Sequence, residues 1–146
     1  MKKIIIILMF VLNIFINFAY CKNVKYTIKP VILDVFDGDT ILIKTKEGTA
    51  SVRLTGIDCY ETKMNSHIKY QKTDDISYEE IFERGRLAKE RLENLISDKN
   101  ISLEITGIDR KYGRFVGVLY SSDGKNINKE MLKDDLCKVY VFKPKK

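Results

Sequence analysis

The chain has 146 residues, of which 45% are hydrophobic and 32% are charged, with eight Gly and two Pro. This composition excludes a disordered or low-complexity chain, and the length allows about one small domain behind a leader. The formal net charge of +6 favours a polyanionic partner such as nucleic acid or an anionic membrane, although solubility alone also accounts for a basic surface.

Residues 1–21 have the pattern of a secretory signal. Two lysines precede an apolar run from Ile4 to Phe18, and small residues three positions apart end at Cys21. Cleavage after Cys21 would leave a domain of residues 22–146, secreted or held in the periplasm or at the cell surface. Two alternatives stay open: the segment is retained as an N-terminal membrane anchor of marginal length, or Cys21 is lipidated.

The remaining cysteines, Cys59 and Cys137, could pair in an oxidising compartment, but the sequence leaves this open. The chain has no CxxC motif and a single histidine, His67, which is expected to be a solvated side chain. A zinc site of the usual kind is therefore not expected.

The first part of the domain has the alternating, β-branched pattern of short strands. Strands are predicted over residues 25–35, 40–44 and 50–57. Turn signals at Asp37-Gly38-Asp39 and Glu47-Gly48 separate them, so we expect a β-meander.

A polar stretch over residues 58–75 predicts a long loop, and such loops are usually functional or mobile. Ser77 and Glu80 then fit a capping box at the start of a helix. Apolar or small residues follow at helical spacing on one face: Ile81, Gly85, Ala88, Leu92 and Leu95. The small members of this stripe are expected to let the helix approach a sheet closely.

The C-terminal part returns to strands. They are predicted over residues 101–108 and 115–120, with Asn128 capping a short helix and an extended piece at 139–142. The predicted fold class is α+β, mainly β: a five-stranded barrel of the OB type with two or three flanking helices.

Three clusters of charged residues lie at the ends of the predicted strands: residues 37–40, residues 53–62 and residues 110–114. Asp37, Asp39, Asp58 and Glu61 are hard oxygen donors, which suit Ca²⁺ or Mg²⁺. Two arginines, at positions 53 and 114, could bind phosphate bidentately. Carboxylates, a divalent cation and two guanidiniums together are what phosphoryl-transfer chemistry requires. Each cluster alone is weak, since an Asp-Gly-Asp turn is usually only a turn.

The order of these clusters resembles the staphylococcal nuclease family. Val35-Phe36-Asp37-Gly38-Asp39-Thr40 is similar to the family's V-x-D-G-D-T motif, and Arg53 through Thr62 to its R-L-x-x-[IV]-D-x-P-E-T segment. Lys111-Tyr112-Gly113-Arg114 matches its K-Y-G-R, and residues 139–144 its tyrosine-bearing segment ahead of Lys-Pro. The resemblance covers most of residues 34–144.

The resemblance implies a Ca²⁺ site. Asp39 and Asp58 would bind the ion through their carboxylates and Cys59 through its backbone carbonyl, with Asp37 and Thr40 supporting these ligands.

The resemblance also implies the catalytic roles. Glu61 would be the general base or orient the attacking water, and Arg53 would neutralise the scissile phosphate. Arg114 would stabilise the transition state and the departing 5′ oxygen. Nucleotide phosphate and base would be bound by Lys111, Tyr112 and Tyr140. The expected protein is a monomeric Ca²⁺-dependent endonuclease that hydrolyses DNA and RNA, preferring single-stranded regions, to 3′-phosphate products.

Two rival functions are retained: an inactive module that binds nucleic acid or protein, and a membrane-anchored basic domain. The sequence departs from the family pattern where Tyr60 replaces Pro, which makes the loop after Asp58 less stiff. Cys59 stands in place of Thr, and the stretch from Asp58 to Gly85 is longer, so this loop could gate substrates.

Overall fold

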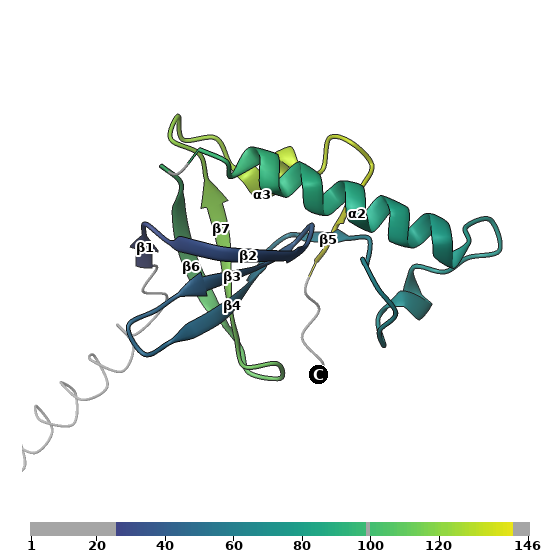
Figure 1. Ribbon diagram of the computed structural model, residues 1–146, viewed down its shortest axis with the longest axis horizontal. Helices are drawn as coiled ribbons and strands as arrows, with labels where there is room; N and C mark the ends of the chain where they lie inside the picture. Colours follow the sequence, from purple (N-terminus) through teal and green to yellow (C-terminus); the bar gives the residue numbers. More distant parts are fainter. Residues whose placement is uncertain (1–25, 99, 142–146) are drawn as a thin grey trace, which may run out of the picture.

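The structure, a computed structural model, describes residues 26–98 and 100–141 (Figure 1). The predicted leader, residues 1–21, and the basic end after residue 141 lie outside this part of the chain. Of the helices within the described residues, none has both the length and the apolar character needed to cross a membrane.

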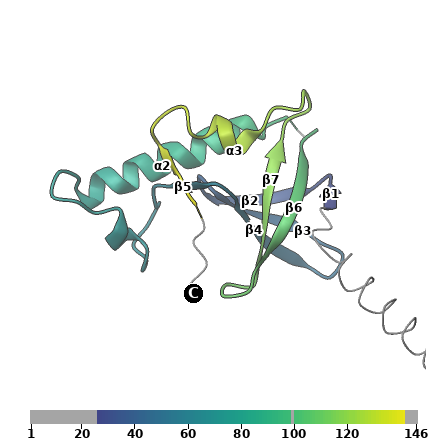
Figure 2. The same cartoon turned by 180° about the vertical axis from the view of Figure 1, so that it is seen from behind.

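Eight strands and two α-helices make up the described part of the chain. In chain order they are β1 (Tyr26–Ile28), β2 (Val31–Asp37), β3 (Thr40–Lys44), β4 (Thr49–Leu54), β5 (Ile57–Cys59), the 3₁₀ turn η1 (Ile68–Tyr70), α2 (Tyr78–Leu95), β6 (Ser102–Asp109), β7 (Arg114–Tyr120), α3 (Ile127–Glu130) and β8 (Cys137–Val139). Six strands form one sheet in the order β1-β6-β7-β4-β3-β2, while β5 and β8 pair separately. The helices lie at one end of the curled sheet and the β6–β7 turn at the other (Figure 2).

The first predicted strand is present but is divided in two. It breaks at Lys29 and Pro30, where proline has no N–H to donate to a ladder. β1 then pairs with β6, whereas β2 pairs with β3. The two edges of the sheet are therefore consecutive pieces of one extended segment, and the sheet must curl to bring them together. This mainly-β arrangement is consistent with the predicted OB-type fold.

The third predicted strand, residues 50–57, is also divided. β4 ends at Leu54 and β5 begins at Ile57, with Gly56 between them at a φ of 81°. This left-handed conformation favours glycine and redirects the chain, so that β5 leaves the large sheet and pairs with β8. The division sends the segment after Ile57 toward the turn between β2 and β3.

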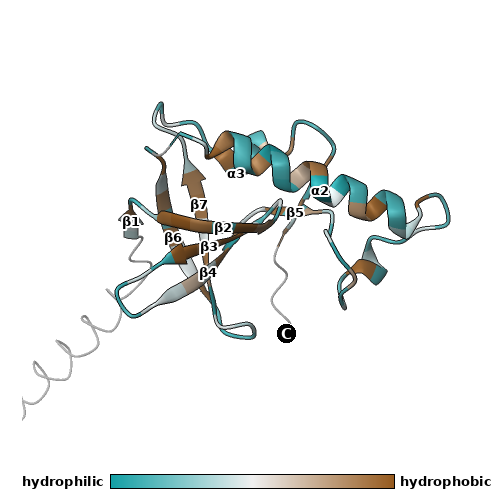
Figure 3. Cartoon of the chain, viewed as in Figure 1, coloured by the Kyte–Doolittle hydropathy of each residue, from teal (hydrophilic) through white to brown (hydrophobic). Residues whose placement is uncertain are grey.

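The core lies between the curled sheet and α2. Its fully buried side chains include Ile41, Val52, Leu54, Leu103 and Leu119 from the sheet and Ala88 and Leu92 from the helix. Burial of each large aliphatic side chain contributes about 1.5–3 kcal/mol. Hydrophobic residues dominate β2, β3 and β7, and the hairpin loops are hydrophilic (Figure 3), although β2 leaves Val31, Leu33 and Phe36 exposed.

The predicted helix start is confirmed and the predicted cap of the short helix is wrong. The Ser77 hydroxyl accepts a hydrogen bond from the Glu80 N–H at 3.1 Å, which is the first half of a capping box. The Glu80 carboxylate accepts from Arg84 instead of reaching back to the cap. In α3 the cap is Asn126, which accepts from the Lys129 N–H at 3.0 Å. Asn128 is buried instead, and its side chain bonds to the backbone of two other segments, at Thr55 and at Gly117 and Leu119 of β7.

The long loop over residues 58–75 is more structured than its polarity predicts. It contains η1, whose Ile68 is buried together with Tyr60, Ile76 and Ile81 in a second apolar cluster. Isolated apolar residues in a polar stretch have no periodicity, so this anchoring is not visible as a pattern.

Candidate active site

The turn between β2 and β3 buries a carboxylate. The Asp39 N–H donates to Asp37 Oδ1 at 3.0 Å, which stabilises the turn locally. Asp39 itself is only 1% exposed, and its Oδ2 accepts from the Cys59 N–H at 2.7 Å. Gly38 is required here, since a Cβ atom would lie 2.7 Å from the Ala88 Cβ and 2.8 Å from the Cys59 Cβ.

Arg53 joins two of the three predicted clusters. It lies on β4 opposite Thr40 of β3, so its side chain projects beside the turn. Its guanidinium forms an ion pair with Asp39 Oδ1, and its Nη2 lies 2.9 Å from Asp58 Oδ1. Asp39 and Asp58 therefore face a single cation, which offsets part of the cost of burying the carboxylates.

The three residues predicted to bind a metal, Asp39, Asp58 and Cys59, lie close together. Among the described residues, no group of three or more His, Cys, Asp or Glu side chains is arranged to hold a metal ion. A site here would consist of the Asp39 and Asp58 carboxylates and the Cys59 carbonyl. These donors fit the oxygen preference of a hard divalent cation, whose remaining ligands would be water or substrate. The Cys59 carbonyl accepts from Gln71 Nε2 at 2.8 Å and keeps a second lone pair.

The third cluster reaches the same turn. Burial raises the pKa of the Asp37 carboxyl, while the charge of Arg53, the hydrogen bonds from Thr40 and the charge of Arg114 act against that rise. Arg53 and Arg114 belong to β4 and β7, which are neighbouring parallel strands. In this ladder Arg53 pairs with Val116, two residues after Arg114, so the two predicted phosphate-binding arginines lie near each other on adjacent strands.

Arg114 is held beside an exposed aromatic ring. Its Nε lies 3.1 Å from Asp109 Oδ2 across the β6–β7 ladder. Its guanidinium lies 4.8 Å from the centroid of the Tyr112 ring, and Lys111 Nζ lies 4.7 Å from the same centroid. Tyr112 is 60% exposed, so this basic and aromatic hairpin is open to solvent.

Tyr140 also lies on the surface. It follows β8, its N–H donates to the Gly56 carbonyl at 3.0 Å, and its side chain is half-exposed. The backbone bond fixes this tyrosine next to the start of β5, the strand that carries Asp58. It lies on a different segment from Tyr112, as the sequence pattern implies.

Glu61 is held by three residues of the long loop that sequence reasoning missed. Its Oε2 accepts from Asn65 Nδ2 at 2.6 Å, and its Oε1 lies 3.1 Å from His67 Nδ1. Its N–H donates to Gln71 Oε1 at 3.0 Å. The His67 side chain is 40% exposed, as expected of a solvated side chain, but it also contacts Glu61, which was not expected. Single polar residues in a polar stretch carry no signal that could have identified them.

Helix α2 packs directly against this segment. A Cβ atom on Gly85 would lie 2.2 Å from the Glu61 carbonyl oxygen. The small residues of the helical stripe therefore serve the site: Ala88 contacts the Gly38 turn, and Gly85 contacts the Glu61 backbone. The predicted close approach of the helix is confirmed, although Gly85 meets the segment after β5 rather than the large sheet.

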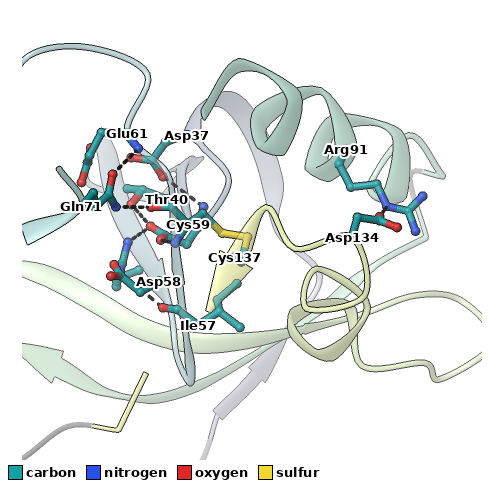
Figure 4. Close-up of a disulfide and its surroundings, with 12 residues drawn as sticks. Asp37, Thr40, Ile57, Asp58, Cys59, Glu61, Gln71, Arg91, Asp134 and Cys137 are labelled. Atoms are coloured by element: carbon teal, nitrogen blue, oxygen red, sulfur yellow. Dashed lines mark hydrogen bonds and ion pairs between the residues drawn. A yellow bond between two sulfur atoms is a disulfide. The ribbon is translucent and has the colours of Figure 1, made fainter. Parts of the chain in front are cut away.

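Cys59 and Cys137 form a disulfide between paired residues of β5 and β8. The bond ties the strand that carries Asp58 to the segment that carries Tyr140. In Figure 4 the disulfide lies on one side of Cys59 and the Gln71 side chain on the other. The backbone N–H and carbonyl of Cys59 keep their hydrogen bonds to Asp39 and Gln71, so the disulfide leaves the predicted carbonyl ligand in place.

Comparison with known proteins gives one family and several relatives. Residues 51–146 match the sequence model of the family described as "Staphylococcal nuclease homologue". An "Uncharacterized endonuclease" of Escherichia coli O157:H7 is 28% identical over 109 residues, which are 75% of this chain and 59% of that protein. "Endonuclease YncB" of Bacillus subtilis is 29% identical over 128 residues, or 86% of this chain and 54% of that protein. "SPbeta prophage-derived endonuclease YokF" of Bacillus subtilis is 32% identical over 111 residues, or 74% of this chain and 33% of that protein. The chain thus matches less than two thirds of the length of each of these relatives.

Proposed function

The chain belongs to the staphylococcal nuclease family, and on that premise we propose that it is a Ca²⁺-dependent endonuclease acting on DNA and RNA. The observation that carries the proposal is the ion pairing of Arg53 with two carboxylates, on the strand next to the one that begins with Arg114. Arg53 contacts Asp39 and Asp58, and Arg53 and Arg114 both act on Asp37. This arrangement supports a site in which phosphate-binding groups lie near acidic oxygen donors, on a mainly-β fold consistent with the OB type.

Asp39, Asp58 and the Cys59 carbonyl would hold the cation. When bound, Ca²⁺ supplies charge stabilisation for the phosphate and lowers the cost of bringing a dianionic transition state to the site. Asp37 and Thr40 support Asp39, through the bonds from the Asp39 N–H to Asp37 and from the Thr40 hydroxyl to Asp39 Oδ1 at 3.1 Å.

The two arginines act on different oxygens of the phosphate. The Arg53 guanidinium, which lies on Asp39 and Asp58, would donate to a phosphate oxygen when these carboxylates hold the cation. Arg114 stabilises the transition state and the departing 5′ oxygen, and its bond to Asp109 keeps its side chain in place beforehand. Loss of the 5′ oxygen leaves the phosphate on the 3′ side, so the products are 3′-phosphates.

Glu61 accepts the proton of the attacking water or orients that water. Asn65 and His67 hold its two carboxylate oxygens, so its side chain loses little freedom on reaching the reactive geometry. Only 15% of the side-chain surface is exposed, which limits competition from bulk water.

The substrate is bound by Lys111, Tyr112 and Tyr140. Tyr112 and Tyr140 offer exposed rings on which bases can stack, and Lys111 offers a charge for the backbone. Stacking tolerates any base but requires that the base be unpaired. The preference is therefore for single-stranded regions of either nucleic acid, without sequence specificity.

We also propose export, through the predicted leader of residues 1–21, to an oxidising compartment such as the periplasm or cell surface. The disulfide between Cys59 and Cys137 supports this, since such bonds persist outside the reducing cytosol. The proposed enzyme acts as a monomer.

The test is hydrolysis of labelled single-stranded DNA and RNA by the full chain with Ca²⁺, with Mg²⁺ and with chelator. We expect cleavage with Ca²⁺ that chelator abolishes, 3′-phosphate ends, and a loss of at least ~10²-fold in Arg114→Ala. Tight binding without cleavage under any metal would contradict the proposal and favour the inactive binding module. Losses below about threefold in Arg114→Ala would contradict the role given to that arginine.

A further inference from the structure

The segment Cys59-Tyr60-Glu61 carries both the proposed carbonyl ligand and the proposed base, yet it has no proline to stiffen it. Tyr60 leaves φ free where a pyrrolidine ring would hold it. Something else must then fix the peptide groups on both sides of Tyr60, because an unconstrained backbone would spread both functional groups over many positions.

One side chain contacts both of these peptide groups. The Gln71 Nε2 donates to the Cys59 carbonyl at 2.8 Å, and the Gln71 Oε1 accepts from the Glu61 N–H at 3.0 Å (Figure 4). In an extended chain, the carbonyl of one residue and the N–H two residues later face the same side, where a neighbouring strand would bond to both. The Gln71 amide takes the place of that strand.

Gln71 is itself anchored. Its N–H donates to the Ile68 carbonyl at 2.9 Å at the end of η1, and Ile68 is buried with Tyr60 and Ile81. The same apolar cluster therefore holds both the glutamine and the residue between its two partners. On the opposite edge, the Tyr60 N–H donates to the Leu136 carbonyl at 3.2 Å. Hydrogen bonds thus hold both edges of the segment.

We propose that Gln71 is a positioning residue, whose amide fixes the Cys59 carbonyl and the Glu61 backbone for the proposed hydrolysis. Its effect on turnover rests on the proposed function, whereas its hold on the backbone does not. A displacement of about 1 Å in a reacting group costs on the order of 10²-fold in rate. Loss of the two Gln71 hydrogen bonds should therefore lower kcat more than it raises KM.

Two variants separate the two bonds. Gln71→Ala removes both. Gln71→Glu has nearly the same shape and keeps an acceptor for the Glu61 N–H, but it sets a carboxylate oxygen against the Cys59 carbonyl. Lys72→Ala is the matched control, because the neighbouring Lys72 amine donates to the Thr73 carbonyl and lies over the Tyr78 ring, and neither partner belongs to the proposed site.

The experiment measures three quantities on the full chain: kcat and KM with single-stranded DNA and Ca²⁺, Ca²⁺ affinity by calorimetry, and hydrogen exchange of the Glu61 amide. We expect kcat to fall by ~10- to 100-fold in Gln71→Ala with KM within about threefold. Glu61 exchange should be at least about tenfold faster in Gln71→Ala and less affected in Gln71→Glu, which weakens Ca²⁺ binding instead. Lys72→Ala should match the wild type in all three.

Two results would overturn the inference. One is a kcat within twofold of wild type in both Gln71 variants. The other is an unchanged Glu61 exchange rate in Gln71→Ala, and that readout needs no catalysis. Failure of the proposed function differs from failure of this inference. In the first case the wild-type chain itself would cleave nothing, while the exchange measurement would still report on the hydrogen bond between the Glu61 N–H and Gln71. Gln71→Glu keeps the test decisive if Gln71→Ala fails to fold.

Discussion

Substitution of Gly85 by alanine should lower turnover far more than it lowers stability. The added Cβ would lie 2.2 Å from the Glu61 carbonyl oxygen, whereas ordinary contact begins at 3.4 Å. The helix and the Glu61 backbone must therefore separate by about 1 Å. A shift of that size in the proposed base costs on the order of 10²-fold in rate.

The effect on folding should be small because two contributions oppose each other. Overpacking destabilises the fold by about 1–3 kcal/mol, and replacing a helical glycine by alanine stabilises it by about 1 kcal/mol. We expect Gly85→Ala to lose about 0–2 kcal/mol of unfolding free energy and to keep its helix content. Urea unfolding followed by circular dichroism, with kcat on single-stranded DNA at saturating Ca²⁺, measures both.

Gly107→Ala is the matched control, because a Cβ on Gly107 meets nothing within 4 Å. It makes the same chemical change on β6, away from Glu61, and should leave kcat unchanged. A Gly85→Ala protein with kcat within threefold of wild type would refute the reasoning, since it would show that the Glu61 backbone can move without loss or that the helix yields instead.

Three further predictions concern the charges, the buried asparagine and the disulfide. Arg53→Ala should melt at a lower temperature in chelator and gain more from Ca²⁺ than the wild type does, because Asp39 and Asp58 lose their shared cation; equal melting temperatures in chelator would contradict this. Asn128→Leu should cost about 2–5 kcal/mol in urea unfolding, since it removes the Asn128 partner of the Leu119 N–H and the Thr55 carbonyl, and a loss below ~1 kcal/mol would refute that role. Cys137→Ser, like reduction of the wild type, should cost about 3–5 kcal/mol, because the bond closes a loop between residues 78 positions apart; an unfolding midpoint insensitive to reductant would show that the bond does not form.

Local patterns determine the elements of this protein. The alternation of apolar residues predicts each of the five main strands, and Ser77 with the stripe through Leu92 predicts α2. Both signals depend on residues close together in the sequence, so they do not depend on how distant segments pack. The order of the charged motifs likewise indicates the family before any contact is known.

The ends of the strands and the cap of α3 show what local patterns do not predict. Pro30 divides the first strand and Gly56 the third, and both signals are visible in the sequence. What they do not reveal is that the pieces pair with different partners, because pairing depends on how the sheet curls. Asn126 and Asn128 are equally good caps by type, and burial of Asn128 against residues 55 and 117 decides between them.

The sequence by itself determined the residue types of the site: two arginines and several carboxylates in a recognisable order. Only the tertiary structure decided that Arg53 is shared by Asp39 and Asp58, and that Gln71 clamps the backbone around Tyr60. The physical reason is that each of these contacts depends on direction and distance between segments that approach one another only when the sheet curls and the loop folds onto its own apolar cluster. Periodicity and motif spacing describe neighbours along the chain and contain no such distances.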